Sequence, residues 1–369
     1  MKNYVVNPVG LVNNSRVYNE KNSYFGDSGD SYNKINYNYS YNYNLNYNNN
    51  LANVCYINSS IQCLFHLKKF VNFIAGSSGN PGSSLFIATR NLLVDMINAK
   101  NLQNKNLSIE KIKEAMSKID KRYKNNNQED ANEFISNFLN ALLDETSDKS
   151  KFMEIKTINI KDSIVREAYI KFYNKFYKRK GKSPLLDIFY GNFITEKYCK
   201  KCKSILSIKF NAFNMLELPI YKLSISKKYY NSLTLDEILN SFFAESKIDD
   251  DFCPLCNQEI YCRSWIYKLP ETLIIYFGRT VNEEFINNKI DYNKQINLSK
   301  YLFNKNYSND NQYKLCCIIY YMSFEKKSGH YTASCICNDG EWYHFDDQII
   351  SKGQQFNSNE IILFYDKYN

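Results

Sequence analysis

The residues that could carry out a reaction in this chain are a cysteine in its first part and a histidine and two carboxylates near its end. Cys55 stands just before a stretch with helical spacing, and His330 follows a glycine late in the chain. Asp346 and Asp347 come soon after that histidine. A cysteine attacks a carbonyl carbon as the thiolate, so it needs a base nearby and a group that orients the base. These segments therefore predict nucleophilic catalysis by a thiol.

The base can be chosen by elimination, because the chain has three histidines: His66, His330 and His344. His66 follows Cys55 by eleven residues on the same expected helix. That separation is roughly 16 Å at about 1.5 Å per residue, which is out of hydrogen-bond reach. His330 stands at a turn that leads into a strand and is free to project into a cleft. His344 shares a strand face with Asp346 and stays open as an alternative.

Helices are expected in the first part of the chain. Apolar residues between 56 and 70 recur at helical spacing, so a helix should begin at or just after Cys55. A helix N-terminus carries partial positive charge and free N–H groups, which favour the thiolate form of a cysteine placed there. Further helices are expected over 85–98, 108–119 and 130–144.

Strands are expected after about residue 185. Alternating or β-rich patterns indicate strands over 206–213, 215–220, 272–277, 313–322, 331–337, 341–345 and 361–365. Helices first and strands later predict an α+β protein.

Two C-x-x-C pairs, Cys199 with Cys202 and Cys253 with Cys256, predict a zinc site. Four thiolates at this spacing can surround one Zn²⁺ tetrahedrally, and a closed four-cysteine site is structural rather than catalytic. The alternatives are reduced cysteines that bind nothing and a redox pair. Neither pair begins a helix after a buried strand, as a thioredoxin-like redox site would require.

Composition excludes several classes of protein. Met1–Gly10 lacks the pattern of a secretory signal, so the eleven cysteines are expected in a reducing, intracellular compartment, cytoplasmic or nuclear or both. No apolar run is long enough for a membrane span. The net charge of +9 is spread thinly, without a basic face interleaved with aromatic residues, so no nucleic-acid partner is expected.

Residues 1–46 differ from the rest of the chain. They form a low-complexity extension rich in Asn and Tyr, with little aliphatic content to build a core, and we expect them to be disordered. The whole chain of 369 residues is 44% hydrophobic, which is enough for a sizeable core outside this extension.

Several motifs together resemble the ubiquitin-specific protease family, the papain-like cysteine deubiquitinases also called ubiquitin carboxyl-terminal hydrolases. The run 50–62 (NLANVCYINSSIQ) is similar to the family's cysteine box, G-L-x-N-x-G-N-T-C-Y-x-N-S-x-x-Q. Ala52 stands where that box has its second glycine, and it is strained if the position needs a positive φ. The other matches, in the family's order, are the runs 128–134 (QEDANEF), 189–191 (FYG), 329–331 (GHY) and 342–347 (WYHFDD). The resemblance covers about residues 47–366.

The resemblance implies a papain-like fold, shaped like a hand, over residues 47–369. A helical thumb (about 47–150) would carry Cys55, and a β-rich palm (about 266–369) would carry the histidine. Zinc-bearing β fingers (about 190–265) would grip the body of ubiquitin. The C-terminal tail of ubiquitin, Leu-Arg-Gly-Gly, would lie in a narrow cleft between thumb and palm.

The resemblance also implies a role for each matched residue. Cys55 would be the nucleophile and His330 the general base, so the resemblance excludes His344 as the base. Asp346 would orient the histidine, with Asp347 as a substitute or helper. Asn50 would donate its side-chain amide to the oxyanion. The implied reaction hydrolyses peptide or isopeptide bonds after the C-terminal glycine of ubiquitin through an acyl-enzyme thioester.

Two acidic residues match family positions near the basic tail of ubiquitin: Asp130 and Glu133. Their alternative roles are N-terminal capping of the expected helix by Asp130 and solvation of Glu133. The expected partners are ubiquitin and ubiquitinated proteins, bound by a monomer. Two other functions stay open: an inactive ubiquitin-binding scaffold and a hydrolase of a ubiquitin-like modifier. A zinc-dependent nucleic-acid binder is disfavoured, because it would rest only on the net charge and the cysteine pairs.

Overall fold

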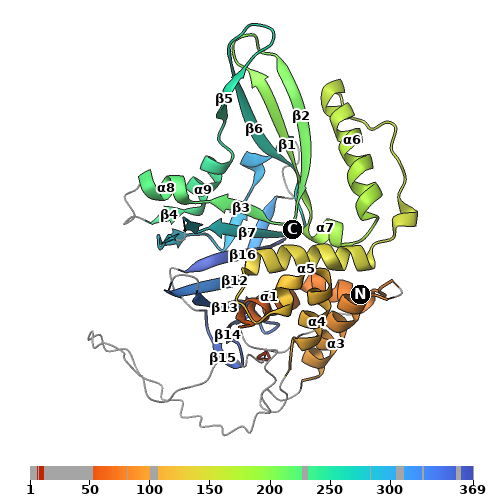
Figure 1. The fold of residues 1–369 in the computed structure, drawn as a ribbon, viewed down its shortest axis with the longest axis vertical. Helices are drawn as coiled ribbons and strands as arrows, with labels where there is room; N and C mark the ends of the chain where they lie inside the picture. The colour runs from red at the N-terminus through yellow and green to blue at the C-terminus, as the bar shows by residue number, and fades with distance from the viewer. Residues whose placement is uncertain are drawn as a thin grey trace.

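The computed structural model arranges the chain as a group of helices, a large sheet and an elongated second sheet (Figure 1). Most helices precede most strands along the chain, so the predicted α+β class is confirmed. The structure describes residues 6, 8–11, 53–80, 82–99, 107–226, 232–282, 284–304, 311–325, 328–354 and 359–368, and all structural statements concern these.

The first helix lies between the other helices of the group and the large sheet. The members of the group are α1 (Cys55–Phe65), α2 (Lys68–Gly76), α3 (Ser84–Asn98), α4 (Glu110–Ile119) and α5 (Ala131–Thr146), with short 3₁₀ helices at Lys121–Lys124 and Lys149–Lys151. Every residue of α1 is buried, because α1 packs on α5 and also on the large sheet. The single helix expected over 56–70 is in fact two helices, since the chain breaks at His66 and Leu67.

The large sheet contains the strands that carry the histidine and the aspartates. Its order is β15 (Ile349–Lys352), β14 (Trp342–Asp346), β13 (Ser328–Ile336), β12 (Gln312–Glu325), β16 (Glu360–Lys367), β7 (Thr272–Gly278) and β3 (Leu216–Pro219), with β11 (Gln295–Asn297) beside β12. β13 and β14 pair antiparallel, with Ala333 opposite Phe345. This register brings the first residues of β13 beside the last residues of β14.

Alternation along these strands separates two apolar cores. On β16, Ile362 and Phe364 face the core shared with α1, whereas Leu363 and Tyr365 face a second core on the other side of the sheet. Successive strand residues point to opposite faces, so a sheet covered on both faces reads as a continuous apolar run.

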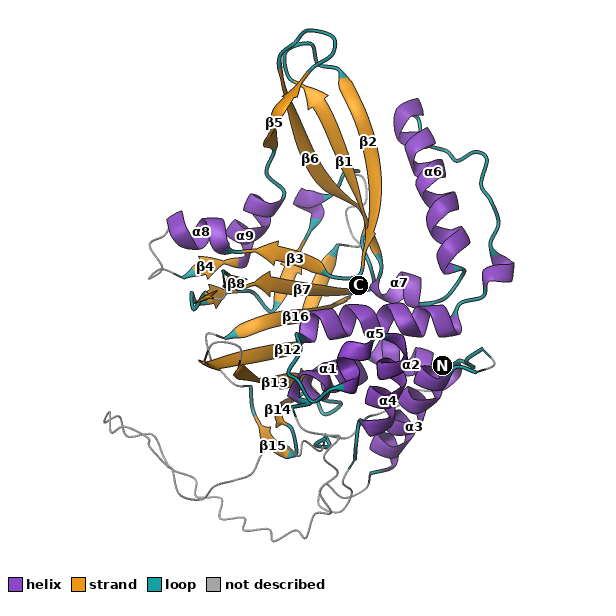
Figure 2. Cartoon of the chain, viewed as in Figure 1, coloured by secondary structure: helices purple, strands orange, loops and turns teal. Residues whose placement is uncertain are grey.

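The second sheet projects away from the large one, as Figure 2 shows. Its order is β2 (Ile205–Phe213), β1 (Gly191–Cys199), β6 (Glu259–Lys268) and β5 (Ser246–Phe252). A helix that the sequence analysis did not predict, α6 (Ser163–Lys180), packs on β2 through the rings of Tyr169 and Phe172 against Phe210. The short helix α7 (Leu185–Phe189) leads from α6 into β1.

The range expected for the fingers, 190–265, also contains part of the palm. Within it lie β3, α8 (Tyr221–Ser226), β4 (Leu233–Thr234) and α9 (Leu235–Phe242). β3 runs parallel to β7 in the large sheet, and α9 packs on β3. The remaining short elements are β8 (Thr280–Val281), β9 (Glu284–Phe285), β10 (Ile290–Asp291) and a 3₁₀ helix at Ser299–Tyr301.

A short segment from the expected extension belongs to the core. Val6, Val9 and Leu11 are all buried among the residues that surround α1. The expectation of disorder over 1–46 therefore does not hold for Val6 and Pro8–Leu11, and the rest of that range lies outside the described residues. Among the helices described, none is long and apolar enough to cross a membrane.

Candidate active site

Cys55 is the first residue of α1, and 3% of it is exposed. Val54 precedes the helix without a side-chain cap, and its carbonyl accepts the N–H groups of residues 57 and 58. Asn53, the residue after Ala52, has a positive φ of +55°. Asn tolerates this left-handed region better than most residues. Asn50 and Ala52 themselves lie outside the described residues.

His330 and Asp346 form the hydrogen-bonded pair that the sequence predicted. Nε2 of His330 lies 2.6 Å from Oδ1 of Asp346. His330 is 8% exposed, and Asp346 is half-buried. The pair forms because His330 is near the start of β13 and Asp346 ends the neighbouring β14. Because Nε2 faces the carboxylate, Nδ1 is the ring nitrogen that would exchange a proton with a thiol.

Gln128 connects the cysteine to the histidine strand, a role the sequence analysis did not assign. Its side-chain amide donates to the Gly329 carbonyl at 2.5 Å and accepts from the Gly329 N–H at 2.9 Å. The same amide nitrogen lies 3.8 Å from Sγ of Cys55. Gln128 therefore holds the residue before His330 beside the nucleophile, and its place in the run 128–134 was the signal that could have identified it.

Asp347 contacts α1 rather than serving as a second copy of Asp346. Its carboxylate accepts from the side-chain amide of Asn58 at 2.8 Å, and its φ is +53°. The acceptor and donor atoms of His330, Asp346 and Asp347 all lie within 4.8 Å of one another. The two adjacent carboxylates thus face different partners, Asp346 the imidazole and Asp347 the first turns of the cysteine helix.

The two acidic residues expected near a ubiquitin tail have distinct contacts. Asp130 precedes α5 but makes no side-chain capping bond, so the alternative of side-chain capping is wrong. Instead its carboxylate accepts from the Tyr331 hydroxyl at 3.2 Å, next to His330. Partial burial of this carboxyl raises the pKa of Asp130. Glu133 is ion-paired with Arg122 at the surface.

The other two histidines have other surroundings. Nδ1 of His66 lies 2.7 Å from the Gln62 carbonyl, its ring packs on Phe345, and burial lowers the pKa of His66 to about 4. His344 contacts the Ser334 hydroxyl at 3.0 Å, and burial lowers its pKa too. Neither ring is the one that pairs with Asp346, which supports the preference for His330.

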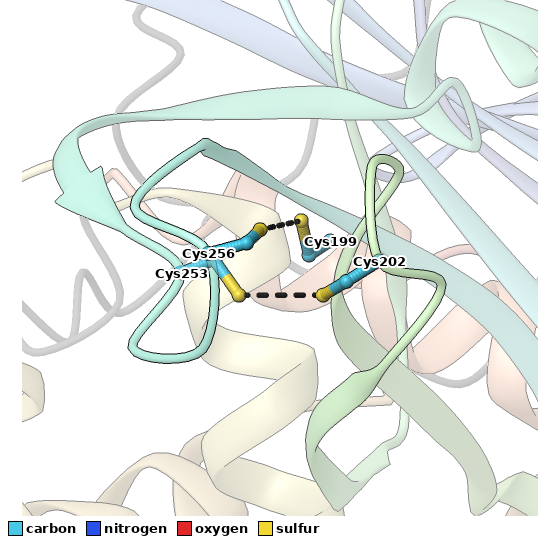
Figure 3. Close-up of side chains that lie close together, drawn as sticks. All are labelled: Cys199, Cys202, Cys253 and Cys256. Atoms are coloured by element: carbon cyan, nitrogen blue, oxygen red, sulfur yellow. Dashed lines mark hydrogen bonds between the residues drawn. The ribbon is translucent and has the colours of Figure 1, made fainter.

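The four cysteines of the C-x-x-C pairs meet where β1 ends and β6 begins, and Figure 3 shows their sulfur atoms close together. Sγ of Cys199 is 3.5 Å from Sγ of Cys256, and Sγ of Cys202 is 3.6 Å from Sγ of Cys253. All four sulfurs lie within 4.8 Å of one another. Tetrahedral zinc with bonds of about 2.3 Å to sulfur would separate the sulfurs by about 3.8 Å. The donor set and its dimensions therefore fit a metal ion.

Both cysteine turns have the same local form, which explains why the sulfurs converge. Each second cysteine is followed by a residue in the left-handed region, Lys203 (φ +57°) after Cys202 and Asn257 (φ +52°) after Cys256. In each turn the first cysteine donates its N–H to a carbonyl five residues on, that of Ser204 or Gln258. Two such turns at the ends of adjacent hairpins point their thiols at one another.

A second group of three cysteines is a packing cluster. Cys63, Cys317 and Cys335 are fully buried, with their sulfurs within 4.8 Å of one another. Their thiols donate to the carbonyls of Ile318 and Cys63 and to the Cys63 sulfur. Burial raises the pKa of all three thiols, so they stay protonated and pack as small apolar groups.

Comparison with known proteins gives a family for this arrangement. The family model "Ubiquitin carboxyl-terminal hydrolase" matches residues 48–365. Ubiquitin carboxyl-terminal hydrolase Usp2 of Drosophila melanogaster is 26% identical over 342 residues, which are 86% of this chain and 34% of the relative. Ubiquitin carboxyl-terminal hydrolase 36 of Drosophila willistoni is 25% identical over 345 residues, 86% of this chain and 24% of the relative. The chain thus spans about a third or less of these relatives.

Solved structures share the fold. A SAGA DUB module containing Ubp8, Sgf11, Sus1 and Sgf73 bound to monoubiquitin matches with a TM-score of 0.65 and 19% identity, covering 87% of this chain and 68% of that one. A yeast SAGA DUB module matches with a TM-score of 0.64 and 18% identity, covering 87% and 68%. Since the family model extends over most of the sequence, this chain belongs to the ubiquitin carboxyl-terminal hydrolase family, which consists of cysteine-type deubiquitinating enzymes.

Proposed function

We propose that this chain is a thiol-dependent deubiquitinase that cleaves peptide or isopeptide bonds after the C-terminal glycine of ubiquitin. One observation carries the proposal. Gln128 contacts both Cys55 and Gly329, and so joins the thiol to the segment that carries the pair of His330 and Asp346. The names of the relatives and the monoubiquitin bound to a protein of the same fold support ubiquitin as the substrate.

The proposed reaction begins with proton transfer from the Cys55 thiol to Nδ1 of His330. The thiolate then attacks the carbonyl carbon of the terminal glycine and forms a tetrahedral oxyanion. The imidazolium, stabilised by Asp346, gives its proton to the leaving amine as the C–N bond breaks and a thioester remains. Water, deprotonated by His330, attacks the thioester, and the released thiolate takes the proton back. The products are a free amine and a ubiquitin carboxylate.

The oxyanion needs donors that are in place before charge develops. We propose that Asn50 provides one through its side-chain amide, as the matching residue does in the family. Losing one such donor costs about 3–4 kcal/mol of transition-state stabilisation.

The tail of the substrate would approach between α5 and β13. We propose that Asp130 and Glu133 attract its arginine, with the carboxylate of Asp130 held by Tyr331 beside the reacting bond. Gly329 lets the Tyr321 ring pack against the start of β13, since a Cβ at this position would lie 2.4 Å from that ring. Glu133 would have to share the arginine with its present partner Arg122.

We also propose one structural Zn²⁺ held by Cys199, Cys202, Cys253 and Cys256. A bound ion would neutralise thiolate charge and fix the two turns to each other, which the apolar contacts of so small a cluster do not achieve alone. Thiolate ligands stay reduced in an intracellular compartment. We therefore propose that the enzyme acts in the cytoplasm or the nucleus or both, as a monomer.

A ubiquitin probe that carries an electrophile at its C-terminus tests the function directly. We expect one covalent adduct on Cys55, seen by intact mass and peptide mapping, and none for Cys55→Ala. The control Cys316→Ala, which removes a half-buried cysteine outside the site, should label as the natural chain does. Binding of ubiquitin without an adduct would indicate an inactive scaffold, and adducts only with probes made from ubiquitin-like modifiers would change the substrate.

The two aspartates should differ in their effect on turnover. We expect Asp346→Asn to lower kcat for a fluorogenic ubiquitin substrate by about 100-fold, because the imidazolium loses its charged partner. Asp347→Asn keeps an oxygen that can accept from Asn58, and its loss should be at least tenfold smaller, on the order of a few-fold. A larger loss at position 347 would reverse the assignment.

Gln128→Leu should lower kcat by roughly tenfold, because the amide contacts to Gly329 and Cys55 are lost and the reacting groups drift apart. The matched control is Gln258→Leu, where an exposed glutamine in the second cysteine turn is replaced. The measurement is kcat from steady-state kinetics on samples shown to be folded. Equal kcat for Gln128→Leu and the natural chain would contradict the bridging role.

Native mass spectrometry should find one zinc ion per chain. Cys199→Ser should abolish it and lower the midpoint of thermal unfolding, whereas Cys262→Ser, at a cysteine on β6 outside the cluster, should retain it. A chain that folds and purifies without metal, with the same midpoint after chelation, would refute the site.

A further inference from the structure

Val6 and Pro8–Leu11, which we call the N-terminal strap, lie before the region that the family model matches. The strap is nevertheless buried in the same core as Cys55. Val6 and Val9 are each 3% exposed and Leu11 is fully buried, in a cluster that includes Phe345 of β14. The strap is therefore packed against the residues around Cys55 and is part of the same core.

The strap contacts α1 through buried side-chain amides. Asn58 donates to the Leu11 carbonyl at 3.3 Å as well as to Asp347, and Gln62 donates to the Val9 carbonyl. Asn58 and Gln62 follow Cys55 by three and seven residues, so all three share one face of the helix. A buried amide left without a partner costs about 1–3 kcal/mol. The cysteine helix is therefore oriented in part by the strap.

The strap also contacts the turn that follows Asp346. The N–H of Leu11 donates to the Asp347 carbonyl at 2.9 Å. Gly10 packs so closely on this turn that a Cβ would lie 2.6 Å from Cα and from the carbonyl oxygen of Gln348. Asn338, in the turn between β13 and β14, donates to the Val6 carbonyl at 2.8 Å. These contacts hold the backbone on both sides of the strand that ends with Asp346.

We infer that the N-terminal strap is a positioning element for the thiol reaction. It joins the helix that begins with Cys55 to the turn that follows Asp346, because Leu11 accepts from Asn58 of the helix and donates to Asp347 of the turn. Asp347 is in the left-handed region, and its carbonyl is the one that Leu11 fixes. The strap thus fixes the direction of the adjacent Asp346 carboxylate relative to α1, while touching none of the reacting atoms itself.

The sequence gives an independent reason for this placement. The family's cysteine box opens with G-L, and the asparagine tract directly before Cys55 contains no glycine. Gly10-Leu11 supplies these two residue types, in the same order, in a segment that packs against the cysteine helix. We therefore infer that the box is divided in this chain, with its first residues contributed by the strap.

The test uses the full chain, a variant without residues 1–11, and Gly10→Val. This inference rests on the proposed function, so two readouts are needed. Turnover of fluorogenic ubiquitin should lose about 10- to 100-fold in kcat with little change in KM, because the reacting groups are misaligned while the substrate surface is intact. The pH profile of Cys55 alkylation by iodoacetamide, followed by peptide mass spectrometry, should change in parallel and requires no ubiquitin.

Rescue separates positioning from general destabilisation. A peptide of residues 5–12 added to the truncated chain should restore both readouts with saturation. Removing residues 1–5 alone should leave both unchanged, and Leu93→Ala, in the buried face of α3, should lower the unfolding midpoint without changing kcat of the folded protein.

Natural kcat and a natural alkylation profile in the truncated chain would overturn the inference. Failure of the peptide to rescue a folded truncated chain would do so as well. If truncation prevents folding, Gly10→Val decides by the same two readouts. A changed alkylation profile in a protein that never turns over ubiquitin would support the strap and reject the proposed substrate.

Discussion

The site depends on one junction, where Gln128 joins the first residue of α1 to the start of β13. The chain must bring these segments together from opposite ends, and Gln128 is itself 201 residues from Gly329 in the sequence. Apolar burial supplies most of the driving force, because every residue of α1 is buried between helices and sheet. It does not by itself fix the rotation of the helix, on which the direction of the Cys55 thiol depends.

Polar groups in this interface fix that rotation. Four neighbouring polar residues of α1 are at most 3% exposed: Asn58, Ser59, Ser60 and Gln62. The serines bond to the Tyr56 carbonyl within the helix, whereas the two amides must find partners outside it. Those partners are Asp347 and the N-terminal strap. Turning the helix would leave buried amides unpaired, so specificity of orientation comes from hydrogen bonding and stability from packing.

Local patterns predicted many of the local features. Helical spacing predicted α3, α4 and α5, β-rich runs predicted β2, β3, β7, β12, β13, β14 and β16, and cysteine spacing predicted the cluster of Cys199 and its three partners. The strands β1, β5, β6, β11 and β15 and the helix α6 were not predicted, and further features that the sequence missed are non-local. The burial of Val6, Val9 and Leu11 could not be predicted, because so short a segment has no periodic pattern, and the likeness of Gly10-Leu11 to the start of the cysteine box becomes visible only once the segment is found against α1. The bridging by Gln128 and the pairing of β3 with β7 depend on segments that meet only in the fold.

The proposed function rests on one step, in which Cys55 is covalently acylated and His330 transfers the protons. Single-turnover reaction with a ubiquitin ester, stopped by acid and analysed by intact mass and peptide mapping, observes this step directly. We predict an adduct of ubiquitin less one water on Cys55, which hydroxylamine removes and which accumulates far more slowly in His330→Ala. Product release from the natural chain with no acylated Cys55, at times shorter than one turnover, would contradict the account.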